Sequence, residues 1–295
     1  MPIIAFKESI SAYLKEIDYK AETYNFSPLH TFKNSLLTDP NVAVNIYAKN
    51  AFYVQINTND FNEILTNTFY YNYSRFQEQT KQIEYLKVST SSAWLLTTIY
   101  YACFFAANEI TNLHGVYNLT LTEDDKKKLI PRNTSNQDSL VRDFLTKGPT
   151  HFEGKAKAIA DNNTIQIHFF SGGGKPHELT WNNLKKVLSY GSRASENRLK
   201  QLTRIKNILS NIQQWKRPNQ IRNEWNYSKP ELYLDDGNRH KDTIINFLDN
   251  FQSINRWAAR TSSKRTNIDD DVISILFLFE ILKNTLEEYK LNILN

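Results

Sequence analysis

The fold depends first on the stretch Ala93-Trp-Leu-Leu-Thr-Thr-Ile-Tyr-Tyr-Ala-Cys-Phe-Phe-Ala-Ala107, which is apolar on nearly every side when it is drawn as a helix. A helix of this kind has no polar face to turn toward water, so other elements must cover it. Serine residues just before it provide a helix start, and the pattern predicts a buried helix over 91–113. Because the apolar run falls short of the roughly 20 residues that cross a bilayer, we expect a core helix and no membrane span.

Helical periodicity continues on both sides of this stretch. Apolar residues recur at intervals of three and four, which is typical of helices that bury one face. The expected helices cover 6–17, 61–86, 196–215, 244–258 and 269–294. The sequence therefore predicts a mainly α protein.

The middle of the chain has a different character. Residues alternate as in a strand over Thr164–Phe170, a glycine-rich segment Ser171–Lys175 follows, and the strand pattern resumes at Glu178-Leu-Thr180. We therefore predict a small β-hairpin over 164–180. Residues 43–56 fit a strand or a helix. We expect residues 1–60 to form an N-terminal extension and residues 61–295 a helical domain, interrupted by an insertion at about 115–190.

Composition limits the classes of function. Lys and Arg number 36 against 31 Asp and Glu, a net charge of +5, which permits a basic surface without indicating a protein that coats polyanions. Cys103 is the one cysteine, which excludes an intramolecular disulfide and a thiolate metal site. Charge appears early at the N-terminus, unlike a secretory signal. We expect a soluble cytoplasmic protein with no metal or cofactor.

A second stretch, Ile221-Arg-Asn-Glu-Trp-Asn-Tyr227, carries the functional hypothesis. Together with Ile99-Tyr-Tyr-Ala-Cys-Phe-Phe-Ala-Ala107 it resembles the HEPN superfamily, the higher-eukaryote and prokaryote nucleotide-binding domains. The resemblance covers roughly 75–113 and 196–260 and implies a helical bundle. It also implies a homodimer that acts on RNA, tRNA included, in bacterial defence or as a toxin.

The family motif places His four to six residues after an Arg-polar pair. In metal-independent cleavage the 2′-hydroxyl attacks the neighbouring phosphate, so a base, an acid and a cation are needed. Here the resemblance implies that Arg222 would stabilise the transition state and that Asn223 would orient the phosphate or Tyr227, which takes the place where the family has His. A tyrosine hydroxyl is normally protonated at neutral pH, which puts catalysis in doubt, and Glu224 or His240 is an auxiliary candidate.

Basic residues surround this motif and favour an RNA-binding track. The candidates for RNA contacts are Arg204, Lys216, Arg217 and Arg239. An ordinary solvated helix face explains any one of them equally well. Arg222 and Asn223 could likewise serve only to tie down a helix end.

Two further motifs have simple structural explanations. The glycine-rich Ser171–Lys175 lacks the second Gly-Lys and the Ser or Thr of a phosphate loop, and we interpret it as a hairpin tip. Asp269–Asp271 could hold a cation, but acids at a helix start are favoured by the helix dipole. The alternative to an RNA-cleaving enzyme is a non-catalytic HEPN-like scaffold, a sensor, or an antitoxin-like partner of a protein encoded nearby.

Overall fold

The computed structural model of the chain describes residues 3–20, 26–89, 91–135, 137–159, 163–188, 196–228, 236–260 and 264–293. These residues are mainly helical, as predicted, and they include one antiparallel sheet. None of the helices in these ranges combines the length and the apolar character that crossing a bilayer requires.

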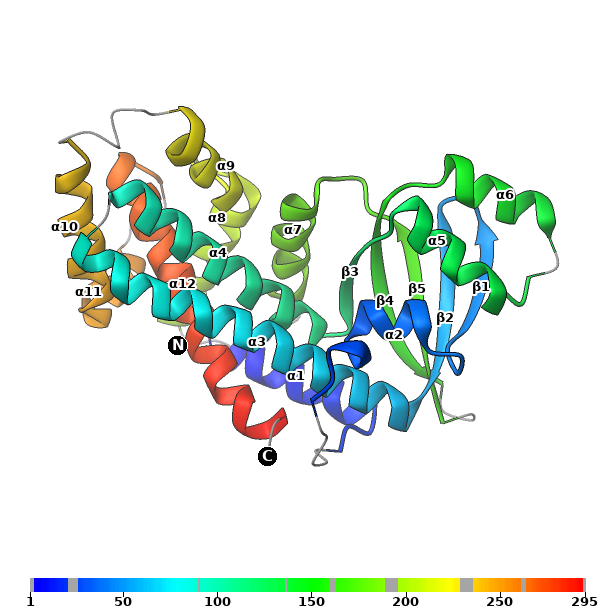
Figure 1. The fold of residues 1–295 in the computed structure, drawn as a ribbon. Coiled ribbons are helices and arrows are strands. Elements are labelled where there is room, and N and C mark those ends of the chain that lie inside the picture. Colours follow the sequence, from blue (N-terminus) through cyan, green and yellow to red (C-terminus); the bar gives the residue numbers. More distant parts are fainter. Residues whose placement is uncertain are drawn as a thin grey trace. The chain divides into compact units, whose positions relative to one another are not determined.

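The helices of Figure 1 are α1 (Ile3–Glu16), α2 (Phe32–Thr38), α3 (Thr58–Ser89), α4 (Ser92–Asn112), α5 (Glu123–Leu129), α6 (Asp138–Lys147), α7 (Pro176–Leu188), α8 (Glu196–Ser210), α9 (Pro218–Asn223), α10 (Asp236–Leu248), α11 (Phe251–Ala258) and α12 (Ile268–Ile293). Short turns are the 3₁₀ helices η1 (Pro28–His30) and η2 (Ile130–Arg132) and the π-helix η3 (Glu224–Ser228). The strands are β1 (Ala43–Ala48), β2 (Ala51–Asn57), β3 (Val116–Thr120), β4 (His151–Ile159) and β5 (Thr164–Ser171).

The chain divides into two compact units. The helical unit comprises Met1–Ser9, Asn72–Ile110 and Trp181–Glu288. The sheet unit comprises Ile10–Tyr71, Thr111–Thr180 and Tyr289–Asn295. Residues from the expected N-terminal extension and from the expected insertion therefore lie in the same unit.

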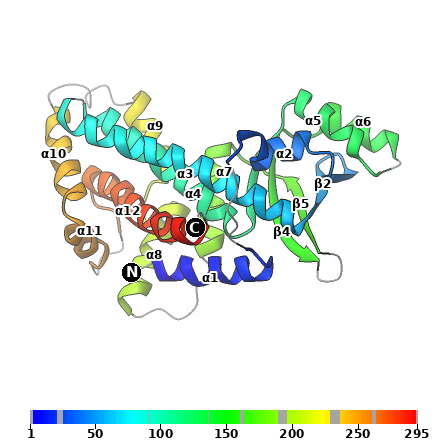
Figure 2. The ribbon, with the colours of Figure 1, turned by 60° about the horizontal axis from the view of Figure 1, so that its bottom comes forward.

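The helical unit is built around α4, as the apolar pattern predicts. Figures 1 and 2 show α3, α4 and α12 side by side, and the Cys103 thiol donates to the backbone oxygen of Ile275. Cys103 is fully buried, and its pKa is raised because burial penalises the thiolate. Tyr73 of α3 reaches α12 through a 2.8 Å hydrogen bond to Glu287. The side chains of three helices thus meet in one core.

Acidic side chains at the start of α12 form hydrogen bonds within the helix start and to α11. Asn267 caps the helix by accepting from the backbone N–H of Asp270 at 3.0 Å. The Trp257 indole of α11 donates to the Asp270 carboxylate, also at 3.0 Å. Burial opposes ionisation of Asp270, but hydrogen bonds from Thr266 and Trp257 outweigh it and leave its pKa below the ordinary value. The acidic cluster therefore has a structural role beyond the helix dipole.

The sheet unit contains five antiparallel strands in the order β1-β2-β5-β4-β3. Side chains on one face of this sheet are buried, and helices cover that face (Figure 1). Phe32 of α2 lies 6.1 Å from Phe169 between ring centroids, and Phe144 of α6 lies 5.6 Å from Phe52. Successive side chains of the central strands point in turn to the buried face and to the opposite, less buried face, as is usual in a sheet with one buried face.

The predicted hairpin over 164–180 is only half right. Thr164–Ser171 is a strand, but its neighbours are β2 and β4, and Pro176–Leu188 is helix α7. The glycine-rich segment is thus a connection from strand to helix. The strands that pair with β5 are β4 and β2, in place of the predicted strand over 178–180. Residues 43–56, which fitted a strand or a helix, form most of the two strands β1 and β2.

Two helix predictions also need correction. The predicted 244–258 helix is two helices, because Asn250 between them caps α11 by accepting from the backbone N–H of Ser253. The helix predicted to reach Trp215 ends at Ser210, and Asn211, Gln213 and Gln214 have positive φ. Trp215 is nevertheless fully buried. The Trp215 ring therefore reaches the core from the turn after α8 and not from a continuous helix.

Gly154 gives a direct test of the sheet register. A Cβ at this position would lie 2.4 Å from the ring of Phe169, which is itself stacked on Phe52 at 4.8 Å. We expect Gly154→Ala to lower the free energy of unfolding in urea by about 1–3 kcal/mol, because the packed ring has no room to move. The control is Gly173→Ala, whose Cβ would meet nothing within 4 Å. Equal stability of the two variants would contradict the register.

Candidate nucleic-acid interface

Arg222 and Tyr227 are brought together by a change of helix type. Arg222 lies in α9, which begins at Pro218, and the next turn, η3, is π-helical. The π-helical turn begins two residues after Arg222, and its wider turn brings side chains five positions apart closer to one side than an α-helix does. The guanidinium carbon lies 5.3 Å from the centre of the Tyr227 ring. The sequence interval that places His in the family motif here places a tyrosine beside the arginine.

The guanidinium of Arg222 is held by two side chains. One terminal nitrogen donates to the Asn223 side-chain oxygen at 2.9 Å, and the other donates to the Tyr101 hydroxyl. Each terminal nitrogen of an arginine has two N–H groups, so each retains one further donor for an acceptor such as a phosphate oxygen. Asn223 thus positions the Arg222 guanidinium, a different role from the one that the sequence predicts for it.

Arg222 belongs to a longer arrangement of arginines and aromatic rings, which we call the arginine–aromatic row. Its guanidinium carbon lies 5.4 Å from the Tyr101 ring centre, and Tyr101 lies 6.4 Å from Phe105, one turn further along α4. Arg75 of α3 lies over the Phe105 ring at 4.0 Å. Each contact falls within cation–π or aromatic-pair range. The members of the row are Arg75, Phe105, Tyr101, Arg222 and Tyr227.

The row is accessible to a ligand. Arg75 is exposed, Tyr227 is 72% exposed, and the side chains between them are half-buried. Trp94, seven residues before Tyr101 and so on the same side of α4, is 52% exposed. The predicted burial of the helix over 91–113 holds for Tyr100, which is 1% exposed, but not for Tyr101, Phe104 and Phe105, which are partly exposed.

The Glu224 side chain forms an ion pair outside the arginine–aromatic row. Its carboxylate pairs with Lys216 at 2.5 Å, and Lys216 lies 3.4 Å from Asp271. Arg265 binds both carboxylate oxygens of Asp271. Two of the predicted residues, Glu224 and Lys216, therefore form an ion-pair network with the start of α12. A carboxylate paired so closely is poorly placed to act as a general base.

His240, the other auxiliary candidate, is also engaged. Its Nδ1 lies 3.2 Å from the Asp269 carboxylate, and its ring packs edge-on against the buried Trp225 at 5.5 Å. These two contacts direct the imidazole toward the start of α12 and the inner side of η3. The side chain of Arg239 lies outside the described residues.

Arg204 stabilises the core, and Arg217 stands at the start of α9. Arg204 is 4% exposed, donates to the backbone oxygen of Arg260 at 2.9 Å, and lies 4.8 Å from the Trp257 ring centre. Burial lowers the pKa of its guanidinium. Arg217 precedes α9, and its backbone N–H is capped by the Gln220 side chain at 2.9 Å. The prediction that Arg204 contacts RNA is therefore wrong, because its guanidinium is inside the core.

The sequence hypothesis did not name Arg75, Tyr101 or Phe105 as site residues. A signal for Phe105 exists, since Tyr101 and Phe105 are four residues apart on one helix face. No sequence signal indicates that Arg75 of α3 lies over that ring. The contact arises only from the packing of α3 on α4.

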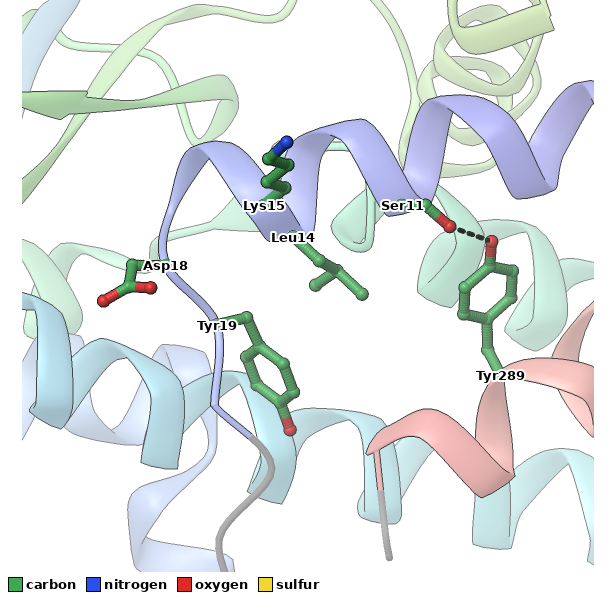
Figure 3. A pocket seen from close by; sticks show the side chains of 6 residues that line it. All are labelled: Ser11, Leu14, Lys15, Asp18, Tyr19 and Tyr289. Atoms are coloured by element: carbon green, nitrogen blue, oxygen red, sulfur yellow. Dashed lines mark hydrogen bonds between the residues drawn. The ribbon is translucent and has the colours of Figure 1, made fainter.

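The sheet unit contains a separate pocket of about 460 Å³ between the second half of α1 and the last turn of α12 (Figure 3). Figure 3 shows Ser11 bonded to Tyr289 across it. The Tyr19 hydroxyl interacts with the Thr66 hydroxyl at 2.7 Å and donates to the backbone oxygen of Ile293. The remaining lining residues are Leu14, Lys15 and Asp18. These groups stabilise the local fold, and they do not resemble a reactive centre.

Arg204 provides a test that separates structure from binding. We expect Arg204→Ala to lower the free energy of unfolding by roughly 2–4 kcal/mol, because it removes a desolvated cation–π contact and leaves a backbone oxygen unsatisfied. Lys206→Ala on the same helix should change stability by less than about 0.5 kcal/mol. Urea denaturation measures both. A marginal effect of Arg204→Ala would show that Arg204 is not a core residue.

Among the described residues, no group of three or more His, Cys, Asp and Glu side chains is arranged to hold a metal ion. No family model, curated protein or solved structure matches the chain. We therefore infer function from the chemistry of the side chains themselves.

Proposed function

We propose that the chain binds single-stranded RNA along the arginine–aromatic row of the helical unit. The observation that carries the proposal is the unbroken succession of contacts from Arg75 through Phe105, Tyr101 and Arg222 to Tyr227. Proteins bind unpaired nucleotides by stacking bases on aromatic rings and by pairing phosphates with cations. The row offers both kinds of group within a few ångströms of each other.

Arg222 is the phosphate contact in this proposal. Its orientation is fixed by Asn223 and Tyr101, so little side-chain entropy is lost when a phosphate binds. A planar guanidinium with one remaining N–H on each terminal nitrogen suits two phosphate oxygens. Tyr227, the most exposed ring of the row, offers its face to a base. Stacking between neighbouring base pairs would hide that face of the base, so the surface favours single strands over duplexes.

The HEPN relationship belongs to this proposal as well. Its support is the Arg222-Asn223 motif and the mainly helical surroundings, and it would bring a homodimer, an RNA such as tRNA, and a role in bacterial defence or toxicity. The non-catalytic alternatives, a scaffold, a sensor or an antitoxin-like partner, use the same surface for binding. The engagement of Glu224 by Lys216 and of His240 by Asp269 favours binding over cleavage.

Metal-independent cleavage is the second candidate, and the closeness of Arg222 and Tyr227 favours it. In such a reaction the 2′-hydroxyl oxygen forms a bond to phosphorus while the bond to the 5′-oxygen breaks. Arg222 would stabilise the charge on the phosphorane, and the Tyr227 hydroxyl would donate a proton to the leaving oxygen. The proton of the attacking 2′-hydroxyl would pass to a solvent water, and the Tyr227 phenolate would regain its proton from solvent. A dimer would supply a second copy of each group.

Binding is tested by fluorescence anisotropy with a labelled oligouridylate and with its duplex. We expect Arg222→Ala to weaken single-strand binding and to reduce the slope of log affinity against log salt by about 0.7, the contribution of one phosphate on a single strand. Tyr227→Ala should cost roughly 1–3 kcal/mol, whereas Tyr227→Phe keeps the ring and the affinity. The control is Tyr85→Ala, a 71% exposed ring outside the row. Unchanged binding by Arg222→Ala would refute the proposal.

Cleavage is tested by incubating the protein with total cellular RNA and with tRNA in EDTA. If the chain is a ribonuclease of this kind, the wild type cuts and Arg222→Ala does not. Tyr227→Phe then loses cleavage while it keeps RNA affinity, because only the hydroxyl has been removed. Intact RNA in the presence of a wild type that binds it would exclude catalysis and leave the binding function.

A further inference from the structure

The outer face of the sheet displays a cluster of aromatic rings that the Arg222 site does not use. We call this cluster the sheet platform. Phe170 is 52% exposed and Tyr47 is 39% exposed, whereas Phe169 and Ile46, the residues just before them on their strands, are buried. Apolar rings of this size on a water-facing surface suggest a binding site. The members of the sheet platform are Tyr47, Tyr53, His168 and Phe170.

The four rings form a continuous surface across three strands. Tyr53 of β2 pairs directly with His168 of β5, and their ring centres lie 5.4 Å apart. Tyr47 of β1 lies 6.0 Å from Tyr53 and 6.4 Å from His168. Along β5, the rings of His168 and Phe170 lie 6.3 Å apart with planes only 14° from parallel. The planes of Tyr53 and Tyr47 are inclined to that of His168 by 38° and 61°. The nearly parallel rings of His168 and Phe170 can therefore each receive one base of a strand that crosses the sheet, and Tyr53 and Tyr47 lie beside them.

Positive charge lies beside these rings. Lys155 of β4 is the register partner of His168, and Lys157 is the partner of Gln166. Both lysines are exposed. Glu153, opposite Phe170, is the acid on this part of β4. The two lysines therefore outnumber the acid and give this edge of the platform a net positive charge.

We propose that the sheet platform is a second binding surface for single-stranded nucleic acid, independent of Arg222. The rings would stack on unpaired bases, and Lys155 and Lys157 would contact the phosphates that connect them. Open antiparallel sheets with aromatic residues on the solvent face bind unpaired nucleotides in this way. The imidazole of His168 is steadied for stacking by a 2.8 Å hydrogen bond between its Nε2 and the Gln166 side-chain oxygen.

The test compares two double variants by anisotropy with the labelled oligouridylate. Tyr47→Ala with Phe170→Ala removes the two most exposed rings, and we expect affinity to fall by roughly 5-fold to 100-fold for each ring that stacks on a base. Tyr47→Phe with Phe170→Tyr keeps both rings and should bind like the wild type. Thermal unfolding of each variant verifies the fold. Lys155→Gln with Lys157→Gln should lower the salt slope by about 1.4.

The outcomes separate this proposal from the function of the Arg222 site. Weaker binding by the platform variant and by Arg222→Ala supports both surfaces. Weaker binding by Arg222→Ala alone overturns the platform proposal, and a different partner such as a protein then becomes the occupant of this face. Weaker binding by the platform variant alone supports the platform and refutes the Arg222 site. A wild type that does not bind the oligonucleotide overturns both.

Discussion

The burial of α4 is the constraint on which the helical unit depends. Its sequence is apolar on nearly every side, so α12, α3 and the turn after α9 must all pack against it. The cover is incomplete along Trp94, Tyr101 and Phe105, where aromatic side chains meet water. Arg222 binds the Tyr101 hydroxyl on this uncovered side, and Arg75 lies over Phe105. The proposed RNA surface is thus the part of α4 that the neighbouring helices leave exposed.

Two arginines of the same unit show how position decides role. Arg204 and Arg222 both lie near aromatic rings and both donate hydrogen bonds. Arg204 is enclosed between tryptophans and a backbone carbonyl, so it stabilises the fold. Arg222 is half-buried, and each of its terminal nitrogens makes one hydrogen bond and has a second N–H group. Charge density along the sequence could not distinguish them, because the distinction depends on which side of α8 or α9 each residue occupies.

The helices are largely predictable from the sequence, and the sheet is not. α4 and α12 follow from local periodicity, which needs no knowledge of distant residues. The sheet depends on pairing between β2 and β5, whose register partners include Phe52 and Phe169. No local pattern joins segments so far apart in the chain, so the residues around β5 predict the wrong strand partner.

The same limitation applies to the candidate site. Arg222, Asn223 and Tyr227 can be named from the sequence because they lie within one short stretch. Arg75 and Tyr53 acquire their positions only by tertiary packing, against Phe105 and His168.

The two proposed surfaces have in common that unpaired nucleotides stack on identified rings in each unit. Photocrosslinking of the protein to a single-stranded RNA containing 4-thiouridine, followed by mass spectrometry of the peptides, tests this most directly. We predict crosslinks at Tyr101, Phe105 or Tyr227 in the helical unit and at Tyr53, His168 or Phe170 in the sheet unit. Crosslinks confined to other parts of the chain, or none at all under conditions where a known single-strand binder is labelled, would contradict the claim.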